Sequence, residues 1–162
     1  MPTPSQTVGP FFGFALPFEG DAAAVPAGDP AAVRIEGQVI DGAGEPVPDA
    51  IIEVWAEDQL ARCRTDPEGA FHFTARKPRA RTDGDGSVHA PHLEVTVFSR
   101  GLLRHLLSRM YFPDEGVANS GDPVLAQVDP QRRATLIARA GGGALHFDIR
   151  LQGDGETVFF AI

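Results

Sequence analysis

From residue 31 onward, the chain alternates short stretches of apolar and polar residues with turns rich in Gly, Pro and Asp. Val33, Ile35, Gly37 and Val39, for example, alternate with polar residues, which is the period of two of a half-buried strand. Strands are expected in this way at 33–39, 50–56, 69–74, 92–98 and 144–151, with 157–160 as a candidate closing strand. Several short strands joined by turns predict an all-β fold, an antiparallel β-sandwich.

The segment 102–112 is compatible with two kinds of structure. Its leucines and Met110 fall at the spacing of an amphipathic helix, although the segment is also apolar enough for a strand. Periodicity alone leaves both open. Short helices are expected at 123–128 and from residue 130, because Pro123 and Pro130 can each occupy the first turn of a helix.

The N-terminal segment has a different composition from the rest of the chain. Residues 1–30 are rich in Pro, Gly and Ala, which interrupt regular structure, and they contain four phenylalanines. Disordered tails rarely carry so many aromatic residues. We therefore expect an extended arm over 1–30 that docks its rings on its own domain or on a partner, followed by one domain over 31–162.

Composition narrows the class of protein and of partner. The chain has 162 residues, enough for one domain, and a net charge of -8 with a single lysine, Lys77. Partners such as nucleic acid or an acidic membrane need clustered basic residues, so neither is expected. No run approaches the ~20 apolar residues of a membrane helix. The start of the chain lacks the pattern of a secretory signal, and the single cysteine, Cys63, suits a reducing compartment, so we expect a cytoplasmic protein.

The motifs of the common catalytic sites are missing from the sequence. There is no nucleotide-binding glycine loop and no G-x-S-x-G element, and Cys63 has no flanking nucleophile signature. On a strand, His92 and Glu94 would project from the same face, and with His89 they would begin a two-histidine, one-carboxylate metal site. The alternative is a hydrogen-bonded histidine on a sheet face beside a solvated or paired glutamate.

A series of motifs spans nearly the whole chain. They lie at 3–10, 35–41, 44–47, 50–55, 64–66, 71–73, 90–95, 109–112, 132–138, 147–153 and 155–160. In this order they resemble the intradiol ring-cleavage dioxygenase family, in which a strand, a tight turn and a strand ending in Trp, here Trp55, lead into an iron site. The resemblance implies a β-sandwich and favours a strand for 102–112.

The resemblance fails at the metal ligands. Catalytic chains of this family hold non-heme Fe(III) with two tyrosines and two histidines, whereas this sequence has one tyrosine, Tyr111, outside the ligand segments. Segments 60–63 and 77–80 stand where the tyrosines are expected. Of the histidines only His92 remains, with Glu94 in the other place. The resemblance therefore implies that this chain binds no metal and has no catalytic residue, and that His92 marks a vestigial metal-site position.

These losses resemble those of the alpha chains of hetero-oligomeric family members, which pair with an iron-bearing beta chain of related fold. The resemblance implies intradiol cleavage of protocatechuate by O2 to 3-carboxy-cis,cis-muconate, in the β-ketoadipate pathway of aromatic catabolism, with Fe(III) bound by the beta subunit. It assigns Arg100 to the shared substrate pocket, together with Thr7, Gly9 and Pro10 of the arm.

Two further hypotheses stay open. The first is a free-standing β-sandwich ligand-binding module, a stable monomer with its Phe-rich arm folded on itself. The second is an enzyme that uses His89, His92 and Glu94 with a different metal. In addition, the segment 56–64 after Trp55 replaces a longer insertion of typical alpha chains, which bears on the interface that they form.

Overall fold

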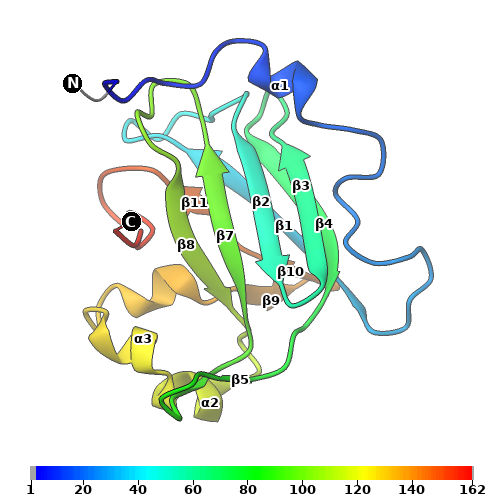
Figure 1. The fold of residues 1–162 in the computed structure, drawn as a ribbon, viewed down its shortest axis with the longest axis vertical. Coiled ribbons are helices and arrows are strands. Elements are labelled where there is room, and N and C mark those ends of the chain that lie inside the picture. Colours follow the sequence, from blue (N-terminus) through cyan, green and yellow to red (C-terminus); the bar gives the residue numbers. More distant parts are fainter. Residues whose placement is uncertain (1–2, 162) are drawn as a thin grey trace.

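The computed structural model describes residues 3–161, which form a sandwich of two facing sheets (Figure 1). One sheet has four strands in the order β3–β2–β7–β8, and every neighbouring pair in it is antiparallel. Its strands are β2 (Ile51–Ala56), β3 (Gln59–Arg64), β7 (His92–Phe98) and β8 (Leu106–Tyr111). The strand expected at 92–98 is confirmed to the residue, and 102–112 holds a strand rather than a helix.

The second sheet is built around its long first strand. It comprises β1 (Ala32–Ile40), β4 (Ala70–Arg76), β9 (Arg139–Gly141), β10 (Ala144–His146) and β11 (Ile149–Arg150). β4 runs antiparallel to β1, while β10 and β11 run parallel to β1 on its other edge. The all-β sandwich is thus confirmed, with two short parallel pairings added to an otherwise antiparallel arrangement.

The core lies between the two sheets and follows from the alternation in the sequence. In β7, Leu93, Val95 and Val97 are buried, and in β4, Phe71 and Phe73 face them from the other sheet's layer. Side chains that alternate along a strand point to opposite faces, so one apolar set per strand fills the interior. This apolar layer fixes the register of each strand, because a slip by one residue would expose it.

Short helices cluster at one end of the sandwich (Figure 1). They are α2 (Gly116–Gly121), α3 (Pro123–Gln127) and a 3-10 turn (Arg133–Leu136), whereas α1 (Phe12–Ala15) lies in the arm at the opposite end. The helix expected at 123–128 is confirmed, and Asp122 caps it by accepting hydrogen bonds from the backbone N–H groups of Val124 and Leu125. No helix within residues 3–161 is long and apolar enough to cross a membrane.

Several expectations need correction. The helix expected from residue 130 is a 3-10 turn that begins three residues later. The strand expected at 144–151 is interrupted between β10 and β11: the N–H of Phe147 still donates to the carbonyl of Glu36, but the side chain of Asp148 accepts from the N–H of Gln38. Segment 157–160 forms only an isolated bridge, Phe160 to Leu107. Sequence reasoning did not include the small hairpin of β5 (Arg81–Thr82) and β6 (Val88–His89).

The segment after Trp55 forms a tight hairpin. Residues 56–64 turn at Glu57 and Asp58 and return as β3, which pairs with β2 along its whole length. Glu57 has a positive φ of 49°, a backbone conformation that non-glycine residues adopt uncommonly and mostly in tight turns. Sequence reasoning missed this strand, since its alternation spans only six residues and a polar residue, Gln59, takes one of the inward positions while Leu60 faces outward.

The arm crosses the end of the sandwich opposite the clustered helices (Figure 1). It contains one helical turn, α1, despite its Pro and Gly content. Its later part joins the second sheet, where the N–H of Ala24 donates to the carbonyl of Thr74 at 2.8 Å. The rings of Phe11, Phe14 and Phe18 remain largely exposed, so most of the aromatic surface of the arm is not buried on its own domain.

Gly37 of β1 lies where the backbone of Phe147 passes close to the strand. A Cβ at this position would lie 1.9 Å from the carbonyl oxygen of Phe147 and 2.8 Å from Cζ of Phe71. Because the obstacle is backbone, Gly37→Ala is expected to lower the free energy of unfolding by about 3 kcal/mol in urea denaturation.

Gly84→Ala is the matched control, since an added Cβ there meets nothing within 4 Å. Its stability is expected to stay within about 0.5 kcal/mol of the parent chain. Equal stabilities of the two variants would contradict the close approach of β1 to residue 147.

Candidate functional site

His92 begins β7 and is 7% exposed. Its Nδ1 lies 2.7 Å from the carbonyl oxygen of Ala90, and its Nε2 lies 3.2 Å from Oε1 of Glu94. Both ring nitrogens therefore lie within hydrogen-bond distance of protein oxygens.

Arg109 connects the other polar groups of this region. β7 and β8 pair in a register that sets Glu94 opposite Arg109, and Nη2 of the arginine lies 3.1 Å from Oε1 of the glutamate. Nη1 donates to Nδ1 of His89 at 3.2 Å, which leaves Nε2–H of that ring to donate to Asp83 at 2.9 Å. Of the three side chains considered as metal ligands, Glu94 and His89 thus contact Arg109, and His92 is linked to it through Glu94.

The charges in this cluster are mutually stabilised. Burial disfavours the charged form of Glu94, but the hydrogen bond from His92 and the positive charge of Arg109 outweigh it, so the pKa of Glu94 lies below its ordinary value. Burial likewise lowers the pKa of Arg109, and contacts with Tyr111 and Glu94 reverse the effect and raise it. Within residues 3–161, no group of three or more His, Cys, Asp or Glu side chains has metal-binding geometry.

Tyr111 lies beneath this cluster and is completely buried. Its hydroxyl donates to Oδ1 of Asp122 at 3.0 Å, and Oδ2 of the same carboxylate accepts from the N–H of Ala90 at 2.9 Å. Burial is the main reason why the pKa of Tyr111 is raised well above its usual range, and the nearby Asp122 adds to it. The phenolic oxygen is thus held in the interior by Asp122.

The two segments that stand in place of the ligand tyrosines have other roles. Residues 60–63 lie in β3, where Cys63 is buried and burial raises the pKa of its thiol. Lys77 bridges Asp114 and Glu115 at 2.6 and 2.7 Å. A ferric site of two phenolates and two imidazoles therefore does not fit the residues that this chain places here.

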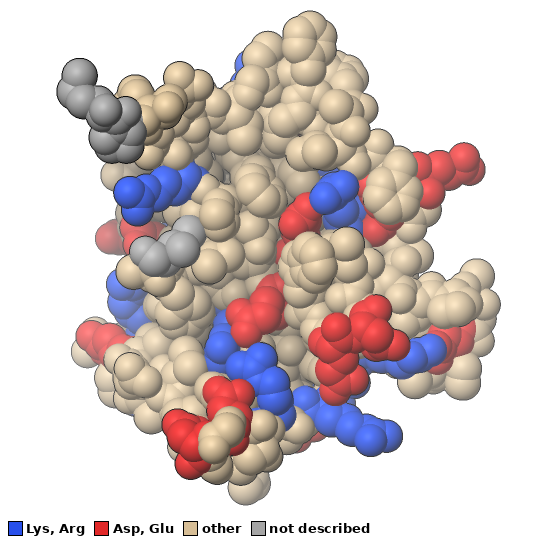
Figure 2. Space-filling model, in the orientation of Figure 1, with Lys and Arg blue, Asp and Glu red and all other residues tan. Residues whose placement is uncertain are grey.

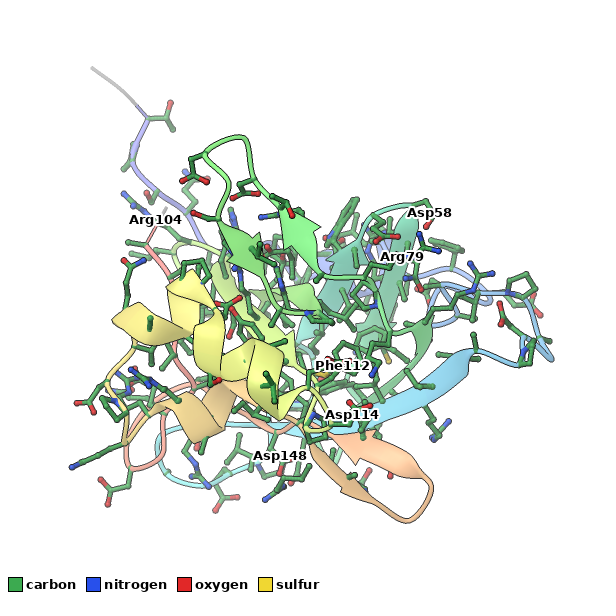
Figure 3. The ribbon with its side chains drawn as sticks, turned by 90° about the horizontal axis from the view of Figure 1, so that it is seen from below. Asp58, Arg79, Arg104, Phe112, Asp114 and Asp148 are labelled. Atoms are coloured by element: carbon green, nitrogen blue, oxygen red, sulfur yellow. The ribbon has the colours of Figure 1, made fainter. Side chains whose placement is uncertain are left out.

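A hollow of about 300 Å³ remains beside His92. Trp55, Pro78, Arg79 and Glu94 are among its lining residues. The N–H of Arg79 donates to a carboxylate oxygen of Glu57 at 3.3 Å, which joins the 77–80 segment to the β2–β3 turn. In the view of Figure 3, Arg79 and Asp58 lie in the same region of the molecule, and the charged residues that line the hollow include Glu57, Arg79, Arg81 and Glu94. The hollow is therefore walled by charges of both signs.

Arg100 lies at the other end of β7, just beyond Phe98. From His92 to Phe98 the strand rises by about 20 Å at 3.3 Å per residue. Arg100 forms an ion pair with Asp49, and the N–H of the next residue, Gly101, donates to Oγ1 of Thr7 at 2.8 Å. The structure thus joins Thr7 to the loop of Arg100, far from His92.

Gly9 and Pro10 continue the arm beyond Thr7 and are exposed. An added Cβ at Gly9 would meet nothing within 4 Å, so the backbone there borders open space. Neither residue contacts Arg100 through a hydrogen bond among residues 3–161. The role of Thr7, Gly9, Pro10 and Arg100 in a substrate pocket stays a prediction.

Sequence reasoning missed Arg109, Asp122 and Asp49. Asp122 precedes Pro123, and an aspartate before a proline is a recognisable helix start that predicts a capping carboxylate. Arg109 carries no comparable signal, because its partners depend on the register between β7 and β8. Asp49 pairs with a residue 51 positions away, which no local pattern reveals.

Comparison with curated proteins identifies close relatives. The chain is 37% identical over 191 residues to the protocatechuate 3,4-dioxygenase alpha chain of Pseudomonas putida, covering 98% of this chain and 95% of the relative. It is 36% identical to the alpha chain from Burkholderia cepacia, covering 99% and 97%. The beta chain from Burkholderia cepacia matches at 29% over 83% of this chain and 71% of the relative. No protein-family model matches.

Solved structures agree on the fold. The dioxygenase domain of a carbohydrate-binding fusion protein from Streptomyces sp. SirexAA-E has a TM-score of 0.60 at 22% identity, covering 94% of this chain and 99% of that chain. Catechol 1,2-dioxygenase from Pseudomonas arvilla C-1 has a TM-score of 0.57 at 21% identity, covering 81% and 55%. By its identity to curated relatives over almost its whole length, the chain belongs to the family of protocatechuate 3,4-dioxygenase alpha chains.

Proposed function

We propose that this chain is the iron-free alpha subunit of a hetero-oligomeric protocatechuate 3,4-dioxygenase. The complex would cleave protocatechuate with O2 between its two hydroxylated carbons and give 3-carboxy-cis,cis-muconate. The alpha chains among the relatives and the match to a beta chain support this function. The non-heme Fe(III) would be bound by the beta subunit, and this chain would contribute part of the substrate pocket.

The observation that carries the proposal is the separation of the two ends of β7. At the His92 end, side chains of the kinds that bind metals are already hydrogen-bonded within the chain: His89 to Arg109, and Tyr111 to Asp122. At the other end, Arg100 and Thr7 lie together, about 20 Å away along the strand, and cannot act on the chain's own vestigial position. Substrate-binding groups so placed suit a pocket that is completed by a second chain.

The arm supports contact with such a partner. Residues 8–18 contain no charged side chain, and Phe11, Phe14 and Phe18 expose their rings. Figure 2 shows that charged side chains are sparse at the top of this face, where Figure 1 places α1. Exposed aromatic rings in an uncharged segment are typical of the centre of a protein interface.

Arg100 would bind the carboxylate of protocatechuate. The substrate is an anion and the chain carries a net charge of -8, so a local cation is needed to offset repulsion. A hydrogen bond to a charged group contributes roughly 1.5 to 3 kcal/mol. Thr7, Gly9 and Pro10 would form the neighbouring wall, with Gly9 allowing the backbone to approach the substrate closely.

A cytoplasmic location is part of the proposal. Cys63 is buried, and burial raises the pKa of its thiol, so it reacts slowly with oxidants. A chain with one inert thiol and no disulfide suits a reducing compartment.

Co-expression with an iron-bearing beta chain tests the function. Oxygen uptake on protocatechuate is expected from the co-purified pair, whereas this chain alone should be inactive because it lacks the ferric site. The beta chain alone serves as the control. A stable monomer that does not associate with the beta chain would favour the free-standing binding module instead, and cleavage by the lone chain would refute the proposal.

Arg100→Ala in the assembled complex tests the role of the cation. Loss of one charge-assisted contact of 1.5 to 3 kcal/mol is expected to raise KM for protocatechuate by roughly 10- to 150-fold. The iron content, measured by metal analysis, should not change, because Arg100 would contact the substrate and is not a metal ligand.

Arg104→Ala is the matched control, since Arg104 is an exposed arginine in the same loop and has no ion pair among residues 3–161. Its KM should equal that of the parent complex. A KM of the Arg100→Ala complex that also stays unchanged would remove Arg100 from the pocket.

A further inference from the structure

The backbone around Arg100 is fixed at several points. The N–H of Leu102 donates to the carbonyl of Ser99 at 3.3 Å and closes a turn, in which Gly101 has a φ of +89°. Thr7 accepts the hydrogen bond from Gly101. Ser99 is buried, whereas the side chain of Arg100 is 58% exposed. The position of the Arg100 Cα is therefore set by the loop, but the direction of its side chain is not.

Asp49 is the group that contacts the Arg100 side chain. Its carboxylate is only 17% exposed, and within residues 3–161 Arg100 is its one ion-pair partner. The backbone beside Asp49 is held by Thr65: Oγ1 of Thr65 accepts from the N–H of Ala50 at 3.0 Å and donates to the carbonyl of Val47 at 2.7 Å. These hydrogen bonds fix the backbone that carries the Asp49 carboxylate.

The geometry of the ion pair leaves half of the guanidinium available. Asp49 accepts from Nε of Arg100, which lies on one edge of the planar group. The opposite edge, formed by the two terminal nitrogens, has no hydrogen-bond partner among residues 3–161. A guanidinium can bind two carboxylates at once, one on each edge, and each edge matches the two oxygens of a carboxylate.

A shallow hollow of about 470 Å³ lies beside this pair. Its lining includes Asp49, Arg64, Thr65 and Arg100. Arg64 is turned toward the arm, where it donates to the carbonyl of Gly13 at 3.3 Å and lies over the ring of Phe14. Arg100 is therefore the arginine in this hollow that is held by a carboxylate and is not turned toward the arm.

We propose that Asp49 is a positioning residue: by holding Nε of Arg100, it aims the terminal nitrogens at the carboxylate of an aromatic acid substrate. This inference rests on the proposed function and deepens it. An unheld arginine side chain would have to lose its rotamer freedom each time the substrate binds, and the ion pair removes that cost in advance.

The opposite effect of Asp49 is also conceivable, and the two differ in sign. If the carboxylate mainly neutralised Arg100, its removal would strengthen the binding of an anionic substrate. If it positions the guanidinium, its removal weakens binding although the local charge becomes more positive. The direction of the change in KM therefore decides between positioning and neutralisation.

Asp49→Asn in the assembled complex is the test. We expect KM for protocatechuate to rise by roughly five- to tenfold with kcat unchanged, because the amide is a weaker acceptor for Nε but is isosteric. Asp49→Glu keeps the carboxylate and should recover most of the affinity. Inhibition by catechol, which lacks the carboxylate, should be the same in all variants.

Glu68→Gln is the matched control for charge, since Glu68 is an exposed carboxylate on the turn next to the hollow, away from Arg100. It removes one negative charge and should leave KM unchanged. In the Arg100→Ala background, Asp49→Asn should have no further effect on KM, because the two residues act as one unit.

The outcomes separate the two levels of the proposal. If Arg100→Ala raises KM and Asp49→Asn leaves it unchanged or lowers it, Asp49 does not position the arginine, while the proposed function stands. If Arg100→Ala itself leaves KM unchanged, the pocket role of Arg100 fails and this inference fails with it. An equal change for catechol and protocatechuate would also overturn it.

Discussion

The contact of Arg109 with Glu94 and His89 determines what one end of this sandwich can do. Its guanidinium is mostly buried, and it joins β8 to β7 and to the small hairpin that ends in His89. Buried carboxylates and imidazoles need a cation or donors near them. Here Arg109 supplies that cation and those donors, so the chain itself balances the charges at this end of the sandwich.

In the proposed function, the chain acts through the other end of the same strand. The rigid sandwich that holds His92 and Arg109 in place also fixes the loop after β7, where Arg100, Asp49 and Thr7 meet. The arm leaves from this point with its aromatic rings exposed. The two regions are separated by the length of a strand, so the loss of metal ligands at one end leaves the proposed pocket residues at the other end unaffected.

Much of the fold could be predicted from the sequence, because alternation and turn residues are local signals. The strand at 92–98 and the helix at 123–128 follow from such signals. The break between β10 and β11 could not be predicted, since it depends on how Phe147 packs in the core. For 102–112, the apolar spacing suits a helix, and pairing with β7 overrides it.

In the candidate site too, some features could be predicted from the sequence and others could not. The number of tyrosines was enough to predict that this chain does not form a ferric site with two tyrosine ligands, because the sequence contains only one tyrosine. The partners of Arg109 and Arg100 were not predictable, since each ion pair joins strands or loops distant in sequence. Side chains that act through long-range pairing become visible only when the register is known.

Metal analysis of the isolated chain tests the central claim most directly. The chain would be incubated with a ferrous salt in air, freed of excess metal, and examined for bound iron and visible absorption. Because His89 is hydrogen-bonded to Arg109 and Tyr111 to Asp122, we expect neither stoichiometric iron nor a colour from tyrosinate bound to Fe(III). One tightly bound iron per chain with such a band would contradict the account.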